Sequence, residues 1–150
     1  MSNRILSYKG LMASGAVEPI LLSTNKGEKG YRIVKLELLA KAPGTVAQEN
    51  IIKIYKDEQT TADGEIDFSD NRLLAAGFYQ DSTSAGDNQA VTVFFDNEIF
   101  NQDIYITMID VSGNDPGIAC NYYLELEVIK LTEDQAMVAT LKDIRNNSTD

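Results

Sequence analysis

The 150-residue chain contains no histidine, no tryptophan and a single cysteine, Cys120. The absence of histidine excludes Ser/His/Asp and Cys/His nucleophile systems, histidine general bases and imidazole-ligated zinc. A single cysteine excludes an internal disulfide and every multi-cysteine metal or redox site. Because Cys120 lies where a turn gives way to an alternating segment, we expect a small buried side chain rather than a nucleophile.

Basic residues are scarce in the second half of the chain. Residues 1–75 contain ten Lys/Arg and ten Asp/Glu, whereas residues 76–150 contain three and thirteen, so the net charge of −10 belongs to the second half. No basic residue lies between Arg72 and Lys130. Nucleic acids and anionic membrane surfaces are disfavoured as partners, because phosphate neutralisation needs clustered Lys/Arg. The acidic half indicates a solvated surface or, alternatively, a face for a basic partner or a weak cation site.

Long apolar runs are also missing. The longest is about Leu73 to Tyr79, well short of the roughly 18 residues of a membrane span. The opening residues, MSNRILSYKG, have neither an apolar h-region nor a cleavage pattern. We therefore expect a protein that is neither exported by a signal peptide nor embedded in a membrane, and a reducing compartment is compatible with the single cysteine.

Several segments alternate with the two-residue period of half-buried strands. The expected strands cover residues 5–8, 20–23, 31–40, 51–56, 73–79, 91–95, 103–111 and 122–130. In the last of them, Leu124 and Leu126 share the face expected in the core, and in 31–40 Val34 and Leu36 share one face while Ile33 belongs to the other. Turns rich in Gly, Asn and Asp separate the segments, and the turn inside 103–131 predicts a β-hairpin there. The chain is thus predicted to be a single all-β domain spanning 1–150, an antiparallel β-sandwich or jelly roll of about eight strands with one C-terminal α-helix.

The C-terminal helix is expected over residues 132–146. Thr132 and Gln135 have the spacing of a capping box. Met137, Leu141 and Ile144 recur at helical spacing and form an apolar stripe. This stripe would close one end or edge of the chain's own sandwich or pack on a neighbouring subunit.

Three patterns that could indicate a site are incomplete. Gly10 to Gly15 has the glycine spacing of a phosphate loop but lacks the following Lys and Ser/Thr. Glu125 and Glu127 could in principle form a glycosidase pair, although their neighbours predict an outward strand face. Residues 110–115 offer oxygen ligands at alternate positions but lack the glycine and distal glutamate of a calcium loop. We therefore expect no catalytic residue, no metal and no cofactor.

Aromatic residues give the remaining candidates. Phe94 and Phe95 are adjacent on an expected strand and must face opposite ways, so one of them faces solvent unless a second sheet or a subunit covers it. The expected interface residues are those with apolar side chains in such positions, namely Phe94, Phe100, Met137, Leu141 and Ile144.

Three segments, DIYIT (103–107), CNYYLELEVIKL (120–131) and ATLKDIR (139–145), resemble small accessory structural proteins of tailed-phage virions, of the head decoration or cement type. The resemblance covers about the last third of the chain. It implies a β-sandwich or jelly roll that clusters on a capsid surface and bridges shell subunits. It also implies a virion location after assembly in the host cytoplasm.

The expected function is therefore that of a non-enzymatic virion structural protein, a homo-oligomer whose partners are other virion proteins, above all the capsid. Unpaired strand edges and an apolar helix face are typical of a β protein that assembles. Two alternatives stay open at this point. One is a carbohydrate-binding or adhesin-like β-sandwich module, and the other is an enzyme that uses carboxylates alone.

Overall fold

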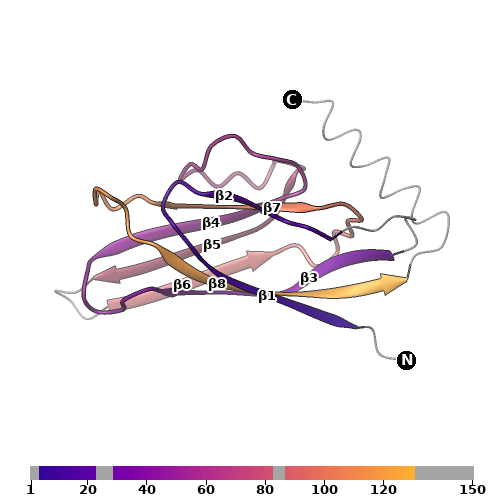
Figure 1. The fold of residues 1–150 in the computed structure, drawn as a ribbon, viewed down its shortest axis with the longest axis horizontal. Helices are drawn as coiled ribbons and strands as arrows, with labels where there is room; N and C mark the ends of the chain where they lie inside the picture. Colours follow the sequence, from indigo (N-terminus) through magenta and orange to yellow (C-terminus); the bar gives the residue numbers. More distant parts are fainter. Residues whose placement is uncertain (1–3, 23–28, 83–86, 131–150) are drawn as a thin grey trace.

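The computed structural model describes residues 4–22, 29–82 and 87–130, and this part of the chain forms eight β-strands (Figure 1). The strands are β1 (Ile5–Met12), β2 (Val17–Ile20), β3 (Lys29–Ala40), β4 (Gln48–Tyr55), β5 (Leu73–Ser82), β6 (Asp87–Phe94), β7 (Ile104–Asp110) and β8 (Cys120–Lys130). They make two sheets: sheet A, with the order β1-β8-β3, and sheet B, with the order β2-β7-β4-β5-β6. Every pair of neighbouring strands is antiparallel, so the prediction of an all-β antiparallel fold is confirmed.

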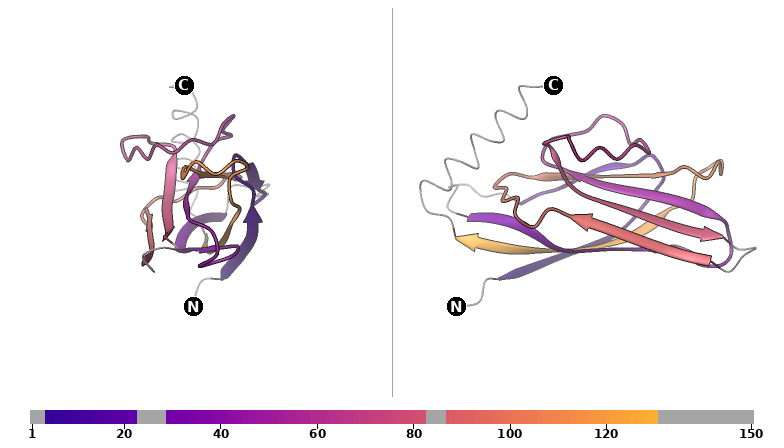
Figure 2. Two further views of the ribbon diagram at one scale, coloured as in Figure 1. Left: turned by 90° about the vertical axis from the view of Figure 1, so that its left-hand side faces the viewer. Right: turned by 180° about the vertical axis from the view of Figure 1, so that it is seen from behind.

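The core lies between the two sheets, which form separate layers when the molecule is seen from its end (Figure 2). Alternation along β8 decides which of its side chains enter the core. Leu124 and Leu126 are 0% exposed, whereas Glu125 and Glu127 lie on the outer face. From sheet B, Ile52 and other aliphatic side chains of β4 and β7 complete the same apolar cluster. Each large aliphatic side chain buried in this way contributes roughly 1.5–3 kcal/mol.

A β-bulge keeps the apolar side chains of β3 on one side of sheet A. The pairing with β8 shifts register between Ile33 and Lys35. Ile33 before the shift and Leu36 after it are 1% and 2% exposed, although simple alternation would place them on opposite faces. The assignment of Ile33 to the outer face and Val34 to the core face is therefore wrong, because the extra residue of the bulge reverses the alternation.

The face of sheet B that points away from sheet A is covered in part by the chain itself. On β4, Ile52 and Ile54 face the core, but Ile51 and Lys53 on the opposite face are also buried, with exposures of 7% and 2%. The segment 56–72, which connects β4 to β5 without a strand of its own, folds back over this face (Figure 1). Sheet B is thus buried on both sides along β4.

The prediction of a β-hairpin over residues 103–131 is wrong. β7 pairs with β2 and β4, whereas β8 lies between β1 and β3 in the other sheet. Residues 111–119 therefore connect the two sheets. The alternating pattern located both strands correctly, but alternation reports which face is buried and not which strand is adjacent.

The other predicted strands are present, with shifted ends. Both ends of β2 lie three residues earlier than expected, since it was predicted over 20–23 and covers Val17–Ile20, while β1 ends and β6 begins four residues away from the predicted positions. The helix expected over 132–146 lies outside the described residues. None of the described residues forms a helix with the length and apolar character of a membrane span.

A test of the core assignment compares two leucines of sheet A. Leu124→Ala should lower the free energy of unfolding by about 2–5 kcal/mol, because it leaves a cavity between the sheets. The matched variant Leu39→Ala, at a position that is 58% exposed, should change it by less than about 0.5 kcal/mol. Urea denaturation followed by circular dichroism measures both values, and equal effects would contradict the assignment.

Candidate interaction surface

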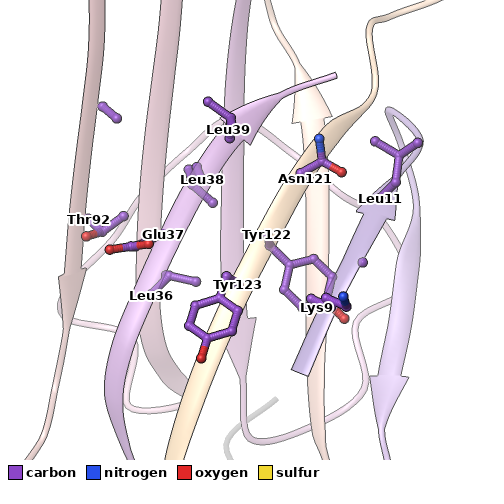
Figure 3. A pocket seen from close by; sticks show the side chains of 12 residues that line it. Lys9, Leu11, Leu36, Glu37, Leu38, Leu39, Thr92, Asn121, Tyr122 and Tyr123 are labelled. Carbon is purple, nitrogen blue, oxygen red and sulfur yellow. The ribbon is translucent and has the colours of Figure 1, made fainter. Parts of the chain in front are cut away.

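A groove of about 820 Å³ crosses the outer face of sheet A and reaches β6 (Figure 3). Strand register places its exposed side chains in two rows. Leu11, Asn121 and Leu39 lie opposite one another on β1, β8 and β3, and the next row begins with Lys9 and Tyr123. Leu11 and Leu39 are 45% and 58% exposed, so one end of the groove presents apolar surface to solvent.

The open backbone edge of β3 forms another wall of this groove. The N–H of Val128 donates to the carbonyl of Arg4, which shows that Val128 bonds toward β1. Because antiparallel ladders alternate, Leu124 and Tyr122 also bond toward β1, and their partners on β3 direct their backbone groups away from β8. Those partners, Leu36 and Leu38, line the groove. Among the described strands none pairs with this edge of β3.

The inner side of β6 completes the groove. Ala90 and Thr92 line it, and they stand on the side of β6 that faces sheet A. Both side chains are small, and at the neighbouring position on β5 Gly77 lets Leu38 approach closely: a Cβ on Gly77 would lie 2.7 Å from a Leu38 methyl carbon. The floor between β3 and β6 is thus lined by small or apolar side chains.

The outer face of sheet A also contains the carboxylate pair considered as a glycosidase site. Glu127 accepts a hydrogen bond from Nε of Arg32 at 3.0 Å, and Glu125 accepts one from the Tyr123 hydroxyl at 2.5 Å. The hydrogen bond to Glu125 raises the pKa of Tyr123. Both glutamates are therefore engaged with neighbours on the outer face of sheet A.

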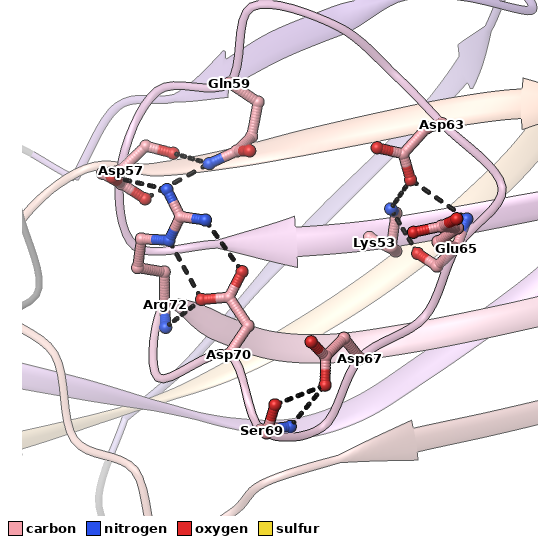
Figure 4. A network of polar contacts seen from close by, with 9 residues as sticks. All are labelled: Lys53, Asp57, Gln59, Asp63, Glu65, Asp67, Ser69, Asp70 and Arg72. Atoms are coloured by element: carbon pink, nitrogen blue, oxygen red, sulfur yellow. Dashed lines mark hydrogen bonds and ion pairs between the residues drawn. The ribbon is translucent and has the colours of Figure 1, made fainter. Parts of the chain in front are cut away.

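A polar network fixes the segment 56–72 on sheet B (Figure 4). Nζ of the buried Lys53 donates to Oδ1 of Asp63 and to the carbonyl of Glu65, at 2.6 Å in each case. Burial acts to lower the pKa of Lys53, but its hydrogen bonds to Asp63 and Tyr55 outweigh burial and raise it. The hydrogen bond from Lys53 in turn lowers the pKa of Asp63. The charged lysine is thus stabilised within the fold.

Arg72 closes the other end of this segment. Its guanidinium makes two parallel contacts with Asp70, from Nε to Oδ1 and from Nη2 to Oδ2, each 2.9 Å long. The hydrogen bond from Arg72 lowers the pKa of Asp70 although burial opposes it. A second carboxylate, of Asp57, lies 3.7 Å from Nη1 of Arg72. Lys56 pairs with Glu98 at 2.9 Å.

Asp110 is the first residue of the incomplete calcium-loop pattern at 110–115. Its carboxylate oxygens accept hydrogen bonds from neighbouring groups of the chain. Its carboxylate accepts from the backbone N–H of Glu49, Ser112 and Ile118, from the Ser112 hydroxyl and from the Asn114 amide, over 2.7–3.2 Å. Burial acts to raise the pKa of Asp110, but these bonds hold it at about 2. Donors surround both oxygens, so the carboxylate ties the crossover from β7 to β8 to the start of β4.

Cys120 is 0% exposed, which confirms the prediction of a buried side chain. Burial raises the pKa of its thiol to about 11. A thiol with this pKa is almost entirely protonated near neutrality and is a poor nucleophile. Within the described residues no group of three or more Cys, Asp or Glu could hold a metal ion.

The predicted interface residues fall into three situations. Phe100 is 4% exposed and stacks on Tyr31 with ring centroids 6.1 Å apart, so its side chain belongs to the core and offers no surface to a partner. Phe94 is partly buried against the same core. Met137, Leu141 and Ile144 lie outside the described residues, and their interface role stays a prediction.

Exposed apolar residues that the sequence analysis did not single out lie on β6 and its surroundings. Val91 and Val93 are 49% and 38% exposed on the outer face of sheet B. Phe68 in the covering segment is 57% exposed and makes an edge-to-face contact with Phe95. Alternation in β6 could not predict that the valines are exposed, because both faces of the strand carry side chains that also occur in cores. One face has Ala90, Thr92 and Phe94, and the other has the two valines.

The chain was also compared with known proteins. No protein-family model matches it, and no curated protein sequence shows significant similarity. Function is therefore inferred from the fold and from the surfaces described above, and the resemblance to virion accessory proteins stays a prediction.

The role of Asp110 can be tested through its pH dependence. A folded-state pKa of about 2, against an ordinary value of 3.8, contributes stability that is present above pH 3.8 and is lost as the pH falls towards 2. This shift is equivalent to about 2 kcal/mol. Between about pH 5 and pH 2, the wild type should lose about 2 kcal/mol more of its free energy of unfolding than Asp110→Asn, which cannot titrate. Urea titrations at both pH values measure the difference, and parallel losses in the two proteins would refute the assignment.

Proposed function

We propose that the chain is a non-enzymatic structural protein of a virion, a decoration or cement protein that binds neighbouring subunits of a capsid shell. The observation that carries this proposal is the groove beside β3. An extended segment of a shell protein would pair with the backbone groups of Leu36 and Leu38, adding a fourth strand to sheet A. Its alternate side chains would lie against Leu39 on one side and Ala90 on the other.

The strand order supports a jelly-roll form of the sandwich. The orders β1-β8-β3 and β2-β7-β4-β5 are those of an eight-stranded jelly roll in which β6 would lie beside β3 and give two sheets of four strands. Here β6 pairs with β5 instead, so sheet A has one strand fewer and the edge of β3 is open. Jelly rolls are frequent in viral capsid and lectin domains, which makes the architecture compatible with an assembly role.

The state of the carboxylates supports a role in contact rather than catalysis. A general acid at neutral pH needs a raised pKa, usually through burial without a partner. Asp63, Asp70 and Asp110 have lowered pKa values, and each is held by hydrogen bonds to its own fold. These carboxylates stabilise loops and are not poised to move protons.

The proposal is tested first on particles. Quantitative mass spectrometry of purified virions of the source virus should find this chain in a fixed ratio to the major shell protein. Its absence from purified virions, or its presence only in traces, would reject the proposed function.

The role of the groove is tested by binding to shells that lack the protein. Leu39→Glu should weaken binding at least about tenfold, because a charge would have to be buried against the docked strand. Val46→Glu places the same charge at a position that is 37% exposed and does not line the groove, so it should bind as the wild type does. Equal binding by the two variants would exclude the groove as the contact.

A carbohydrate-binding module is the second candidate, and one feature of the groove favours it. The partly exposed ring of Tyr123 lies on the same sheet face as the polar side chains of Glu37 and Asn121, an arrangement that can stack on a sugar and bind its hydroxyls. A glycan array distinguishes the two functions. Micromolar binding to a defined glycan that is abolished by Tyr123→Ala would support this candidate over the first.

A further inference from the structure

We propose that strand β6 pairs with the β6 strand of a second copy of this chain, so that two five-stranded sheets join across a twofold axis. This inference goes beyond the proposed function, since it concerns self-association and not the particle to which the chain binds. It is carried by the position of β6, by the composition of its edge and by the direction of its backbone groups.

β6 is the outermost strand of sheet B and pairs only with β5 among the described strands. The right-hand view of Figure 2 shows it at the front of the molecule, with its length along the surface. Residues 88–91 and Val93 are exposed. The edge therefore presents a row of backbone N–H and C=O groups over eight residues.

The other three sheet edges have features that hinder antiparallel pairing with an identical strand, and residues 88–95 at the edge of β6 have none of them. β1 has Lys9 near its middle, β2 is four residues long and contains Pro19, and β3 has a bulge between Ile33 and Lys35 together with several basic residues. Residues 88–95, NQAVTVFF, contain no charge and no proline, and the pairing of β6 with β5 has no register shift. Charges, prolines, bulges and shortness are the usual protection of strand edges, so β6 is the edge best suited to pair with its own copy.

The ladder with β5 shows which backbone groups are free for this pairing. The N–H of Phe95 donates to the carbonyl of Leu74 at 3.0 Å, which places Phe95 in a hydrogen-bonded position toward β5. By alternation Val93 and Val91 also bond toward β5. The N–H and C=O groups of Thr92, and of the residues two before and two after it, are directed toward the open edge.

These directions define a register for two antiparallel copies. With the twofold axis at Thr92, the outward groups of Thr92 meet those of its own counterpart, and Ala90 meets Phe94 of the second copy. On the outer face of the joined sheet, Val91 then lies opposite Val93 of the second copy. Four half-exposed valines come together, and the apolar surface that each presents to solvent is reduced.

The absence of charge at the centre of this edge is compatible with a second copy as its occupant. Two molecules with a net charge of −10 repel each other, so they can associate only through a surface without like charges in opposition. Asp87 is the only charged residue of β6, and this register puts it opposite position 97, beyond the end of the second β6 strand. The five positions that meet directly, residues 90–94 of each copy, are therefore uncharged.

Light scattering after gel filtration of the full chain tests the inference. The wild type should have twice the mass of the 16.5 kDa chain. Val91→Lys combined with Val93→Lys should yield monomers, because four lysines would meet across the axis, while both positions are exposed enough to keep the fold. The control Leu11→Lys adds a lysine to β1 at a position that is 45% exposed and should leave the dimer intact. Circular dichroism checks that each variant is folded.

Hydrogen exchange followed by NMR locates the contact. The amides of Ala90, Thr92 and Phe94 should exchange slowly in the wild type and rapidly in the double lysine variant, whereas those of Val91 and Val93 or their replacements stay protected by β5 in both. A monomeric wild type, a dimer that survives the two lysines, or rapid exchange at Thr92 in the dimer would each overturn the inference. None of these outcomes bears on the presence of the chain in virions, so failure of the dimer and failure of the proposed function are distinguishable.

Discussion

The face-to-face packing of a three-stranded sheet on a five-stranded sheet is the constraint on which the rest of the structure depends. Sheet A can cover only part of sheet B, and both sheets end in strands whose backbone groups need partners. Two other parts of the chain cover some of this surface and pair some of these backbone groups. The segment 56–72 covers the outer face of β4, and the bridge between Tyr31 and Phe100 occupies one end of the β3 edge. Beside Leu36 and Leu38, and along the outer edge of β6, no described strand covers the backbone groups.

The uneven distribution of charge along the chain is explained in part by the contacts that hold loops on the two sheets. In the first half of the chain, basic side chains hold the covering segment on sheet B, as Lys53 and Arg72 do. The second half has almost no basic residues, and its aspartates are stabilised by backbone N–H groups instead. Asp81 accepts from Gly44 at 2.6 Å, Asp103 from Leu22 at 2.7 Å, and Asp110 from three backbone groups. Part of the acidic excess therefore ties loops to strands, and it is not simply a field directed at a basic partner.

The sequence was sufficient to locate the strands but not to assign their neighbours. Alternation identified β8 and its core leucines because each strand is buried on a defined face. It failed at Ile33, where a bulge adds one residue, and over 103–131, where a turn-like segment connects two sheets rather than two adjacent strands. The alternation pattern could not predict the groove, because the groove exists only if no strand lies beside the outer edge of β3. The edge of β3 is left open because β6 pairs with β5, and this choice between distant strands is not encoded in the pattern of any one segment.

The open edges of β3 and β6 differ in chemistry, and this difference favours different occupants. The edge of β3 lies in a groove bordered by Lys9 and Glu37, and its own strand is rich in basic residues, so an occupant must match a mixed polar rim and a bulge. Such a site favours a specific foreign segment over an identical copy. Residues 88–94 of β6 have no charge to match and no irregularity to accommodate, and an antiparallel copy would pair the outward backbone groups of Ala90, Thr92 and Phe94. A chain that self-associates along one edge and binds a shell segment along the other would link neighbouring binding positions, which is the mechanical effect required of a protein that reinforces a capsid.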